Sequence, residues 1–339
     1  MRIQHPGYVG PRKRLREALD EHRPGHMVFL IGPSGVGKTT MRHSVMQEMF
    51  GKPAYWGRGR IPAIETFVTL PKNAYFSSRE LAKAMLNELH APTLDWLFRG
   101  GNFDPSTEQA IKAELAECAS TWNVLRPRQA TEGEYWGMIQ RSLPVRGCKY
   151  VSLDQVTALL VNHRDTSPAD HILNLMVLAE TTGVMFIMTG VQSASRLWAV
   201  HSELRRRVVT VWVPPYSDRR PQDRLPFLRL LTSLSTKYSL SREDLLLGMP
   251  SDILAATGGV FAEIVQLLDR AKDRARAEGR SRLSKRDIEA SYYPDADLKA
   301  LTRDIDSFEE SMLAGDVSKR SALIQARWAA AAPVGANTE

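Results

Sequence analysis

Residues 32–39 read Gly-Pro-Ser-Gly-Val-Gly-Lys-Thr and match the pattern G-x-x-x-x-G-K-[ST] at every fixed position. The apolar run 27–31 before the motif predicts a buried strand, and helical spacing follows from about residue 38 to residue 50. A strand, a glycine-rich turn and a helix in this order place main-chain N–H groups around a phosphate. The motif therefore predicts an α/β fold with a phosphate-binding loop.

The residues of this loop have distinct predicted roles in binding ATP. The Lys38 ammonium can reach the β- and γ-phosphates, and the Thr39 hydroxyl can ligate Mg²⁺. A glycine-rich turn that matches by chance is the alternative, and the flanking strand and helix argue against it. The predicted nucleotide-binding residues are Gly32, Pro33, Ser34, Gly35, Val36, Gly37, Lys38, Thr39 and Thr40.

A second apolar strand, at 149–153, is followed by Asp154 and Gln155. A carboxylate at the end of such a strand can hold Mg²⁺ directly or through water, so Asp154 is the predicted partner of Thr39. Related enzymes carry a glutamate at the next position. The Gln155 amide can hydrogen-bond a water but cannot accept its proton. Gln155 therefore indicates either slow natural hydrolysis or a substitution that traps the ATP state. The alternative for Asp154 is a simple turn cap.

Two further polar features accompany later strands. Thr189 ends the strand 184–189, where a polar side chain can contact the γ-phosphate or orient a water; an ordinary strand-end residue is the alternative. Residues 205–207 are three successive arginines before the apolar strand 208–213. An arginine here could reach the ATP of a neighbouring subunit and stabilise its phosphate charge. A solvated helix end or a DNA contact is the alternative for these arginines.

Strands that alternate with helices predict a parallel sheet covered by helices on both faces. Further strands and helices are expected at 63–70, 77–90, 106–124 and 131–143, with a loop at 91–106. Beyond Pro214-Pro215, residues 221–278 show helical spacing without buried strands. We therefore predict a nucleotide-binding domain at 1–215, a helical lid at 216–295 and a mobile or partner-binding tail at 296–339.

The formal net charge of +7 favours a polyanionic partner such as nucleic acid. Basic clusters occur at Arg126 and Arg128 and in residues 270–286, which hold eight basic and two acidic residues. Each cluster can also be a solvated helix face. Two cysteines exclude a disulfide scaffold and fit a reducing cytoplasm. No apolar run approaches the roughly 18 residues that span a bilayer, so we expect a cytoplasmic protein without a membrane partner.

With these motifs in order, the chain resembles AAA+ ATPases of the initiator-like group, and more narrowly the transposition regulators TnsC and TniB. The resemblance covers about residues 5–290 and rests on HPGY and LREAL, GPSGVGKTT, ELAKAMLNELHAP, YVSLDQ, IMTGVQS, SELRRRV and PPYSD. It implies an AAA+ P-loop NTPase with a helical lid. It also implies that Arg207, with Arg206 next, is the arginine finger, the residue that contacts the ATP of a neighbouring subunit. Gln155 departs from the family pattern. The segment TGGVFAE also lacks the arginine that many AAA+ proteins use as a second sensor.

The resemblance further implies ATP-dependent assembly on double-stranded DNA, as a ring or helical filament of the hexamer or heptamer type. Such a homo-oligomer recruits a transposase to a target chosen by a selector protein, in some systems one associated with a CRISPR effector. ATP hydrolysis to ADP and phosphate would disassemble it. A replication or helicase-loading ATPase and an ATP-gated scaffold without turnover are the alternatives. A small-molecule P-loop kinase fits the arginine triplet less well.

Overall fold

The computed structural model describes residues 6–68, 76–99, 103–121, 130–160, 167–199, 202–313, 321–322 and 324–327. Five strands form one sheet in the order β2-β3-β4-β1-β5, and every neighbouring pair is parallel. Parallel strands with both faces covered are continuously apolar, and β1 and β4 are buried along their whole length. The strands are β1 Met27–Ile31, β2 Ala63–Phe67, β3 Tyr150–Asp154, β4 Met185–Gly190 and β5 Val208–Trp212.

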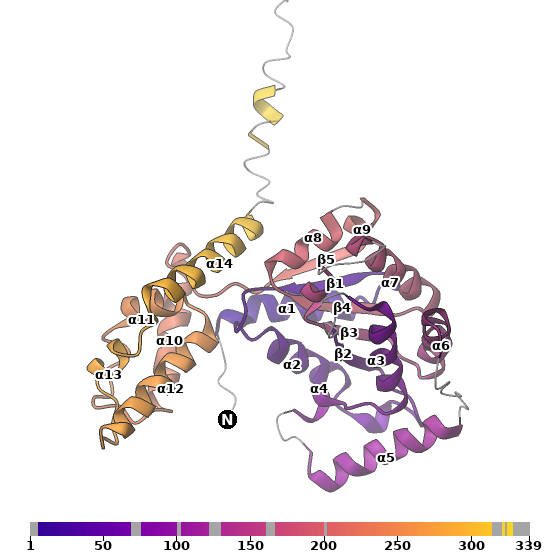
Figure 1. The fold of residues 1–339 in the computed structure, drawn as a ribbon, viewed down its shortest axis with the longest axis horizontal. Coiled ribbons are helices and arrows are strands. Elements are labelled where there is room, and N and C mark those ends of the chain that lie inside the picture. Colours follow the sequence, from indigo (N-terminus) through magenta and orange to yellow (C-terminus); the bar gives the residue numbers. More distant parts are fainter. Residues whose placement is uncertain are drawn as a thin grey trace, which may run out of the picture.

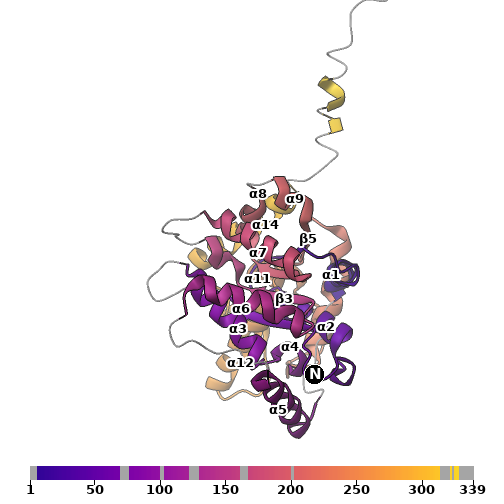
Figure 2. The ribbon, with the colours of Figure 1, turned by 90° about the vertical axis from the view of Figure 1, so that its right-hand side faces the viewer.

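Helices cover both faces of this sheet, which confirms the predicted α/β architecture. Figure 2 shows α3, α6 and α7 on one side of the strands and α1 and α2 on the other. Local capping explains two helix starts: the Ser77 hydroxyl accepts from the N–H of Glu80, and Thr131 forms a capping box with Glu134. These helices are α1 Val9–Asp20, α2 Lys38–Phe50, α3 Ser78–His90, α4 Asp95–Phe98, α5 Pro105–Thr121, α6 Glu132–Val145, α7 Pro168–Thr182, α8 Arg196–Ala199 and α9 Ser202–Arg207.

Two element boundaries differ from the sequence-based expectation. The strand expected at 63–70 ends at Phe67, and the expected loop at 91–106 contains the short helix α4 and the start of α5. Helix α4 forms because Trp96 and Leu97 are buried in the core of the sheet, which outweighs the weak helix preference of a four-residue segment.

The helices after residue 216 surround a second buried cluster of their own, which includes Leu230, Leu246, Ile264 and Leu268. These helices, here called the lid, are α10 Arg224–Ser235, α11 Pro250–Thr257, α12 Phe261–Ala277 and α13 Lys285–Glu289, and they lie beside the sheet (Figure 1). The predicted boundary at 215/216 falls between the two clusters and stays a prediction. In the described part of the chain, no single helix is long and apolar enough to cross a membrane; α11 and α12 pass such a test only as a pair bent by 108°.

The start of the predicted tail lies in the helix α14, Asp295–Leu313, and the mobile or partner-binding role of the tail stays a prediction. Helix α14 runs diagonally across the lid toward the sheet (Figure 1). Phe308 is fully buried and packs edge-on against Trp212, with ring centroids 5.7 Å apart. Glu309 accepts hydrogen bonds from Arg219 at 3.0 Å and Arg220 at 3.1 Å. Glu309 thus ties α14 to the segment that leads into the lid. Residues 314–320, 323 and 328–339 lie outside the described residues.

Candidate nucleotide-binding site

A cavity of about 1240 Å³ lies where the carboxyl ends of the strands meet the lid. In the sheet register Leu30 of β1 pairs with Thr189 of β4, and Leu153 of β3 pairs with Met188. The phosphate loop, Asp154 and Thr189 therefore leave the sheet at one edge, where open parallel sheets bind ligands. The cavity is lined by the phosphate loop, the start of α2, the ends of β2, β3 and β4, the segment after α4, and α12. Its lining residues include Gly37, Lys38, Thr39, Asp154, Gln155, Thr189, Phe261 and Gln266.

Two glycines of the phosphate loop adopt the left-handed backbone region and also face close neighbours. Gly35 has φ +78° and Gly37 has φ +93°. A Cβ on Gly35 would lie 2.7 Å from the Cβ of Ala262, and one on Gly37 would lie 2.5 Å from the hydroxyl of Tyr8. Both the turn and the close packing thus require glycine. The N-terminal segment and the lid pack directly on the predicted phosphate-binding loop.

Lys38 lies folded along the same loop. Its ammonium donates hydrogen bonds to the carbonyl oxygens of Gly32, at 2.8 Å, and Pro33, at 2.7 Å. Burial lowers the pKa of Lys38 to about 8, and the nearby Asp154 carboxylate opposes this effect. The pKa of the Lys38 ammonium is therefore close to neutral pH, and an anionic ligand in the cavity would favour its charged form.

The two predicted metal ligands lie in direct contact. The Thr39 hydroxyl donates to Oδ2 of Asp154 at 2.9 Å, and the main-chain N–H of Gln155 donates to Oδ1 at 2.8 Å. A hydroxyl and one carboxylate are the hard oxygen ligands with which proteins hold Mg²⁺ beside phosphates. The described residues contain no cluster of three or more His, Cys, Asp or Glu side chains suited to a metal. The donor set therefore fits Mg²⁺ held jointly with a nucleotide rather than a metal caged by protein alone.

Gln155 has an unusual backbone conformation for a residue with a long side chain. Its φ is +57°, in the left-handed region, and its side chain is exposed at the cavity. Residues other than glycine, asparagine and aspartate rarely adopt this backbone region, because it costs them about 1–2 kcal/mol. Strain of this kind collects at functional positions. The backbone turn aims the amide of Gln155 toward the cavity, immediately after Asp154.

Arg42 is a site residue that the sequence reasoning missed. It lies on α2, is fully buried, and donates from Nη1 to the Thr189 hydroxyl at 2.7 Å and from Nη2 to Oδ2 of Asp154 at 3.0 Å. It is also ion-paired with Glu65 of β2, which lies 2.9 Å from Nε2 of His43. Burial lowers the pKa of Arg42, and Asp154 opposes the shift. The sequence offered one signal: Arg42 follows Thr39 by three residues, so both lie on one helix face.

A second missed residue, Arg99, comes from the segment expected to be a loop. It lines the cavity after α4 and is exposed. The Gln47 side-chain amide donates to the carbonyl oxygens of Leu97 at 3.0 Å and Arg99 at 2.9 Å. These bonds fix the end of α4 against α2. Arg99 is thus an arginine of the same chain that lines the cavity, whereas Arg42 lies behind its wall.

The arginine triplet does not join this cavity. Arg207 ends α9 and is ion-paired with Glu180 of α7. It precedes Val208, which pairs with Met27 at the start of β1, whereas the phosphate loop follows the other end of β1. Arg207 and the exposed Arg206 therefore lie across the sheet from the loop of their own chain. Arg126 and Arg128, the predicted DNA contacts, lie outside the described residues.

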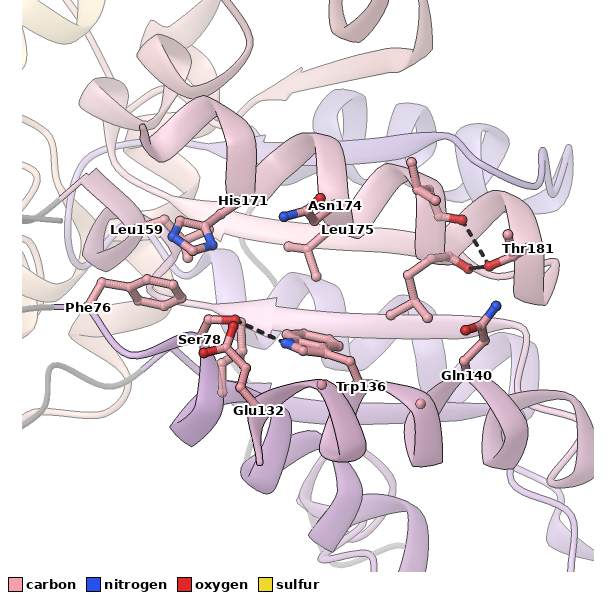
Figure 3. Close-up of a pocket in the computed structure, with 15 residues that line it drawn as sticks. Phe76, Ser78, Glu132, Trp136, Gln140, Leu159, His171, Asn174, Leu175 and Thr181 are labelled. Carbon is pink, nitrogen blue, oxygen red and sulfur yellow. Dashed lines mark hydrogen bonds between the residues drawn. The ribbon is translucent and has the colours of Figure 1, made fainter. Parts of the chain in front are cut away.

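A separate cavity of about 380 Å³ lies between α3, α6 and α7. Figure 3 shows His171, Asn174 and Leu175 facing Trp136 and Gln140 across it, and the Trp136 indole donates to the Ser78 hydroxyl at 3.0 Å. None of the described residues that line it is a lysine or arginine, so it lacks the groups that bind phosphate. The larger cavity is therefore the better nucleotide site.

No protein-family model matches the chain, and no curated protein sequence matches it. Solved structures do resemble it. The Walker-type ATPase PABY2304 of Pyrococcus abyssi has a TM-score of 0.52 at 14% identity, with 89% of each chain covered. The Aeropyrum pernix ORC2 protein in its ADP form has a TM-score of 0.51 at 14% identity, covering 86% of this chain and 68% of that one. The same protein in its ADPNP–ADP complexes has a TM-score of 0.50 at 15% identity, covering 89% and 71%. The chain has an α/β fold of the AAA+ ATPase type.

Proposed function

We propose that the chain is an ATP-binding AAA+ regulator of the TnsC/TniB type, which assembles on double-stranded DNA and recruits a transposase to a selected target. The observation that carries the nucleotide part is the meeting of Lys38, Thr39, Asp154 and Thr189 at one cavity between the phosphate loop and the lid. The transposition part rests on the sequence resemblance.

In this proposal each group has a task in binding ATP. The main-chain N–H groups of the phosphate loop and the Lys38 ammonium would bind the phosphates, and Thr39 with Asp154 would hold Mg²⁺. The metal would neutralise charge on the phosphate oxygens. Gln155 can hold a water at the cavity but cannot take its proton, so hydrolysis is slow.

The lid supplies apolar and amide groups to this site. Phe261, Ala262, Val265 and Gln266 of α12 line the cavity, and no arginine accompanies them among the described lid residues that do so. Closure of the lid over ATP would therefore rest on packing and on the N–H of Ala262, which donates to the carbonyl of Gly35 at 3.1 Å.

DNA binding is supported by the charge of the lid. Lys272, Arg276, Arg282 and Arg286 are exposed on and beside α12 and α13. Arg280 differs, because its guanidinium donates to the Asp287 carboxylate at 2.6 Å. Exposed cations fit a phosphate backbone and carry no sequence information.

A homo-oligomer is supported by the position of the arginine triplet. A finger must reach a phosphate, yet Arg206 and Arg207 lie across the sheet from the phosphate loop of their own chain. The nucleotide that such an arginine could reach is that of a neighbouring subunit. Cys118 and Cys148 are both buried, and two buried cysteines in a chain of this length support a reducing compartment such as the cytoplasm.

One alternative has an observation in its favour. An ATP-gated scaffold without turnover would need the binding residues but no general base, and Gln155 at the exposed left-handed position meets this description. Both functions predict ATP-dependent assembly. They differ in phosphate release, which is slow for the regulator and absent for the scaffold.

Electron microscopy of the purified chain with ATP, Mg²⁺ and duplex DNA tests the proposal. We expect rings or filaments on DNA, and we expect none from Lys38→Ala, which lacks the charge that faces the phosphates. Normal assembly by Lys38→Ala, or no ATP-dependent assembly by the unaltered chain, contradicts the proposal. Co-sedimentation of a transposase encoded beside this chain with the assembled DNA complex tests the recruitment step.

A further inference from the structure

We propose that Arg42 is a positioning residue for the ATP site: it sets the orientation of Asp154 and of the Thr189 hydroxyl. The inference rests on the proposed binding of ATP and Mg²⁺ at the phosphate loop. It adds a role for a residue behind the cavity wall that touches neither phosphate nor metal. A single buried guanidinium contacts the ends of two strands and the interior of a third.

Arg42 links three neighbouring strands from one face of the sheet. Its partners are Glu65 on β2, Asp154 at the end of β3 and Thr189 on β4. Arg42 is fully buried, and Glu65 and Asp154 are 7% exposed. A planar guanidinium offers several donors in fixed directions, so it can hold two groups at a fixed separation. The distance between Asp154 and Thr189 is thereby set by one side chain.

The direction of the bond to Thr189 has a chemical consequence. A guanidinium has no acceptor, so the Thr189 oxygen must accept the bond from Nη1 at 2.7 Å. The Thr189 proton is then left to point elsewhere, and Thr189 lines the cavity. Arg42 thus leaves the hydroxyl proton available to an acceptor in the adjoining cavity. A donor at this place suits a phosphate oxygen or the lone pair of a water.

Asp154 is fixed at both carboxylate oxygens. Its Oδ2 accepts from Thr39 and Arg42, and its Oδ1 accepts from the main-chain N–H of Gln155. Rotation of the carboxylate would break at least two of these bonds. Partners that hold a metal ligand in this way commonly change metal affinity or activity by about 10–100-fold when they are altered.

Glu65 also holds the guanidinium, through the same Nη2 that donates to Asp154. One cation faces two carboxylates here, and His43 lies 2.9 Å from Glu65. A neutral residue at position 42 would leave the buried carboxylates of Glu65 and Asp154 without their cationic partner, which is strongly destabilising. Arg42→Lys is therefore the informative change, because it keeps the charge and removes the planar fork.

The test measures ATP binding to Arg42→Lys in the full chain with and without Mg²⁺, together with ATP hydrolysis in a Gln155→Glu background. We expect affinity without Mg²⁺ to change little, because the phosphate loop and Lys38 are intact. The gain in affinity on adding Mg²⁺ should fall by about 10–100-fold, and kcat should fall by a similar factor with a smaller change in KM.

Arg146→Lys is the matched control, since Arg146 is equally buried and donates to carbonyl oxygens of Leu89 at 2.8 Å and Gly59 at 2.6 Å, outside the cavity. If the role of Arg42 is purely structural, Arg42→Lys and Arg146→Lys should both lower the melting temperature. Neither should then change the gain in ATP affinity on adding Mg²⁺ or the kcat. That result overturns the proposal.

Glu65→Gln provides a second route if Arg42→Lys does not fold. It keeps Arg42 but weakens the contact that fixes it, so the Mg²⁺ gain should fall by a smaller factor, and an unchanged gain overturns the proposal. No ATP binding by the unaltered chain would contradict the proposed function itself. ATP binding and hydrolysis that do not respond to Arg42→Lys or Glu65→Gln contradict the role of Arg42 alone.

Discussion

The main-chain N–H of Gln155 donates to Oδ1 of Asp154 at 2.8 Å, so the residue that replaces the expected glutamate also helps to hold the predicted metal ligand. This bond depends on the backbone of Gln155 and not on its side chain. A change of side chain at position 155 should therefore alter the chemistry of the cavity and leave Asp154 in place.

Gln155→Glu should raise ATP hydrolysis by roughly 10²–10⁴-fold, because a carboxylate can accept the proton of the attacking water and an amide cannot. Phosphate release at saturating ATP and Mg²⁺ measures the effect, with ATP affinity as the control. An ordinary rate in the unaltered chain, or no gain from glutamate, contradicts the assignment of this position as the base.

Gln155→Gly should raise the free energy of unfolding by about 1 kcal/mol, since glycine adopts the left-handed region without the penalty that glutamine carries. Denaturant unfolding of the chain without nucleotide measures this. Gln140→Gly is the control: Gln140 is an exposed glutamine inside α6, where glycine should cost about 0.5–1 kcal/mol. Loss of stability in both variants would show that the backbone at 155 is not strained.

ATP affinity should weaken above about pH 8, where the Lys38 ammonium of the free protein loses its proton. Because only the charged form attracts phosphates, Kd should rise by up to about tenfold per pH unit until the pKa of the bound form is reached. Lys38→Arg, which stays charged, should show no such rise. An affinity of the unaltered chain that stays constant from about pH 7 to about pH 9.5 would contradict the role of Lys38.

The same pKa makes an opposite prediction for stability without nucleotide. The pKa of Lys38 is about 8 in the folded chain and 10.5 ordinarily, so between these values the unfolded chain binds more protons. Its contribution to the free energy of unfolding should therefore increase as pH rises from about 8 to 10.5. The difference in pH dependence between the unaltered chain and Lys38→Met, measured by denaturant unfolding, isolates this contribution.

Arg207→Ala should keep folding and much of the ATP affinity but lose ATP-driven assembly, because a finger acts on the nucleotide of a neighbour. A mixture of Arg207→Ala with Lys38→Ala should assemble better than either variant alone, since one subunit supplies a finger and the other a phosphate loop. Glu180→Ala is the control, because it frees Arg207 from its ion pair without removing it. No rescue by mixing, with weaker DNA binding by Arg207→Ala at low salt, would identify a DNA-facing arginine instead.

DNA binding should require ATP and fall steeply with salt, with little dependence on base sequence. Substituting alanine for Arg276 and Arg282 should lower the slope of log affinity against log salt by about one for each phosphate that is no longer neutralised. Arg242 is a suitable control, because it is exposed but lies 3.4 Å from Asp244. A shallow slope, or a strong preference for one sequence, would contradict backbone binding by the lid.

The sequence predicted the sheet and the phosphate loop because their signals are local. The apolar strands are continuous, and the glycine motif is eight residues long. The convergence of Lys38, Thr39 and Asp154 follows from these elements, since parallel strands end at one edge of a sheet.

The Arg42 contacts could not be predicted in the same way. They join residues separated by 23 positions, to Glu65, and by 147 positions, to Thr189. Helical spacing places Arg42 on the same face of α2 as Thr39, but it does not identify the residues that Arg42 contacts. The left-handed φ of Gln155 is set by how the chain leaves β3, and the burial of Phe308 depends on Trp212, so neither was visible in the sequence.

The helix α14 has a consequence for the way the molecule loses its structure. It packs through Phe308 on the core around the sheet, and Ile305 lies against Gly258 at the end of α11 in the lid. Unfolding of either core would remove part of the surface against which α14 packs. The apolar side of α14 would then be exposed to water. The free energies of the two cores are thereby coupled, and heat should unfold the sheet and the lid in one cooperative transition rather than in two.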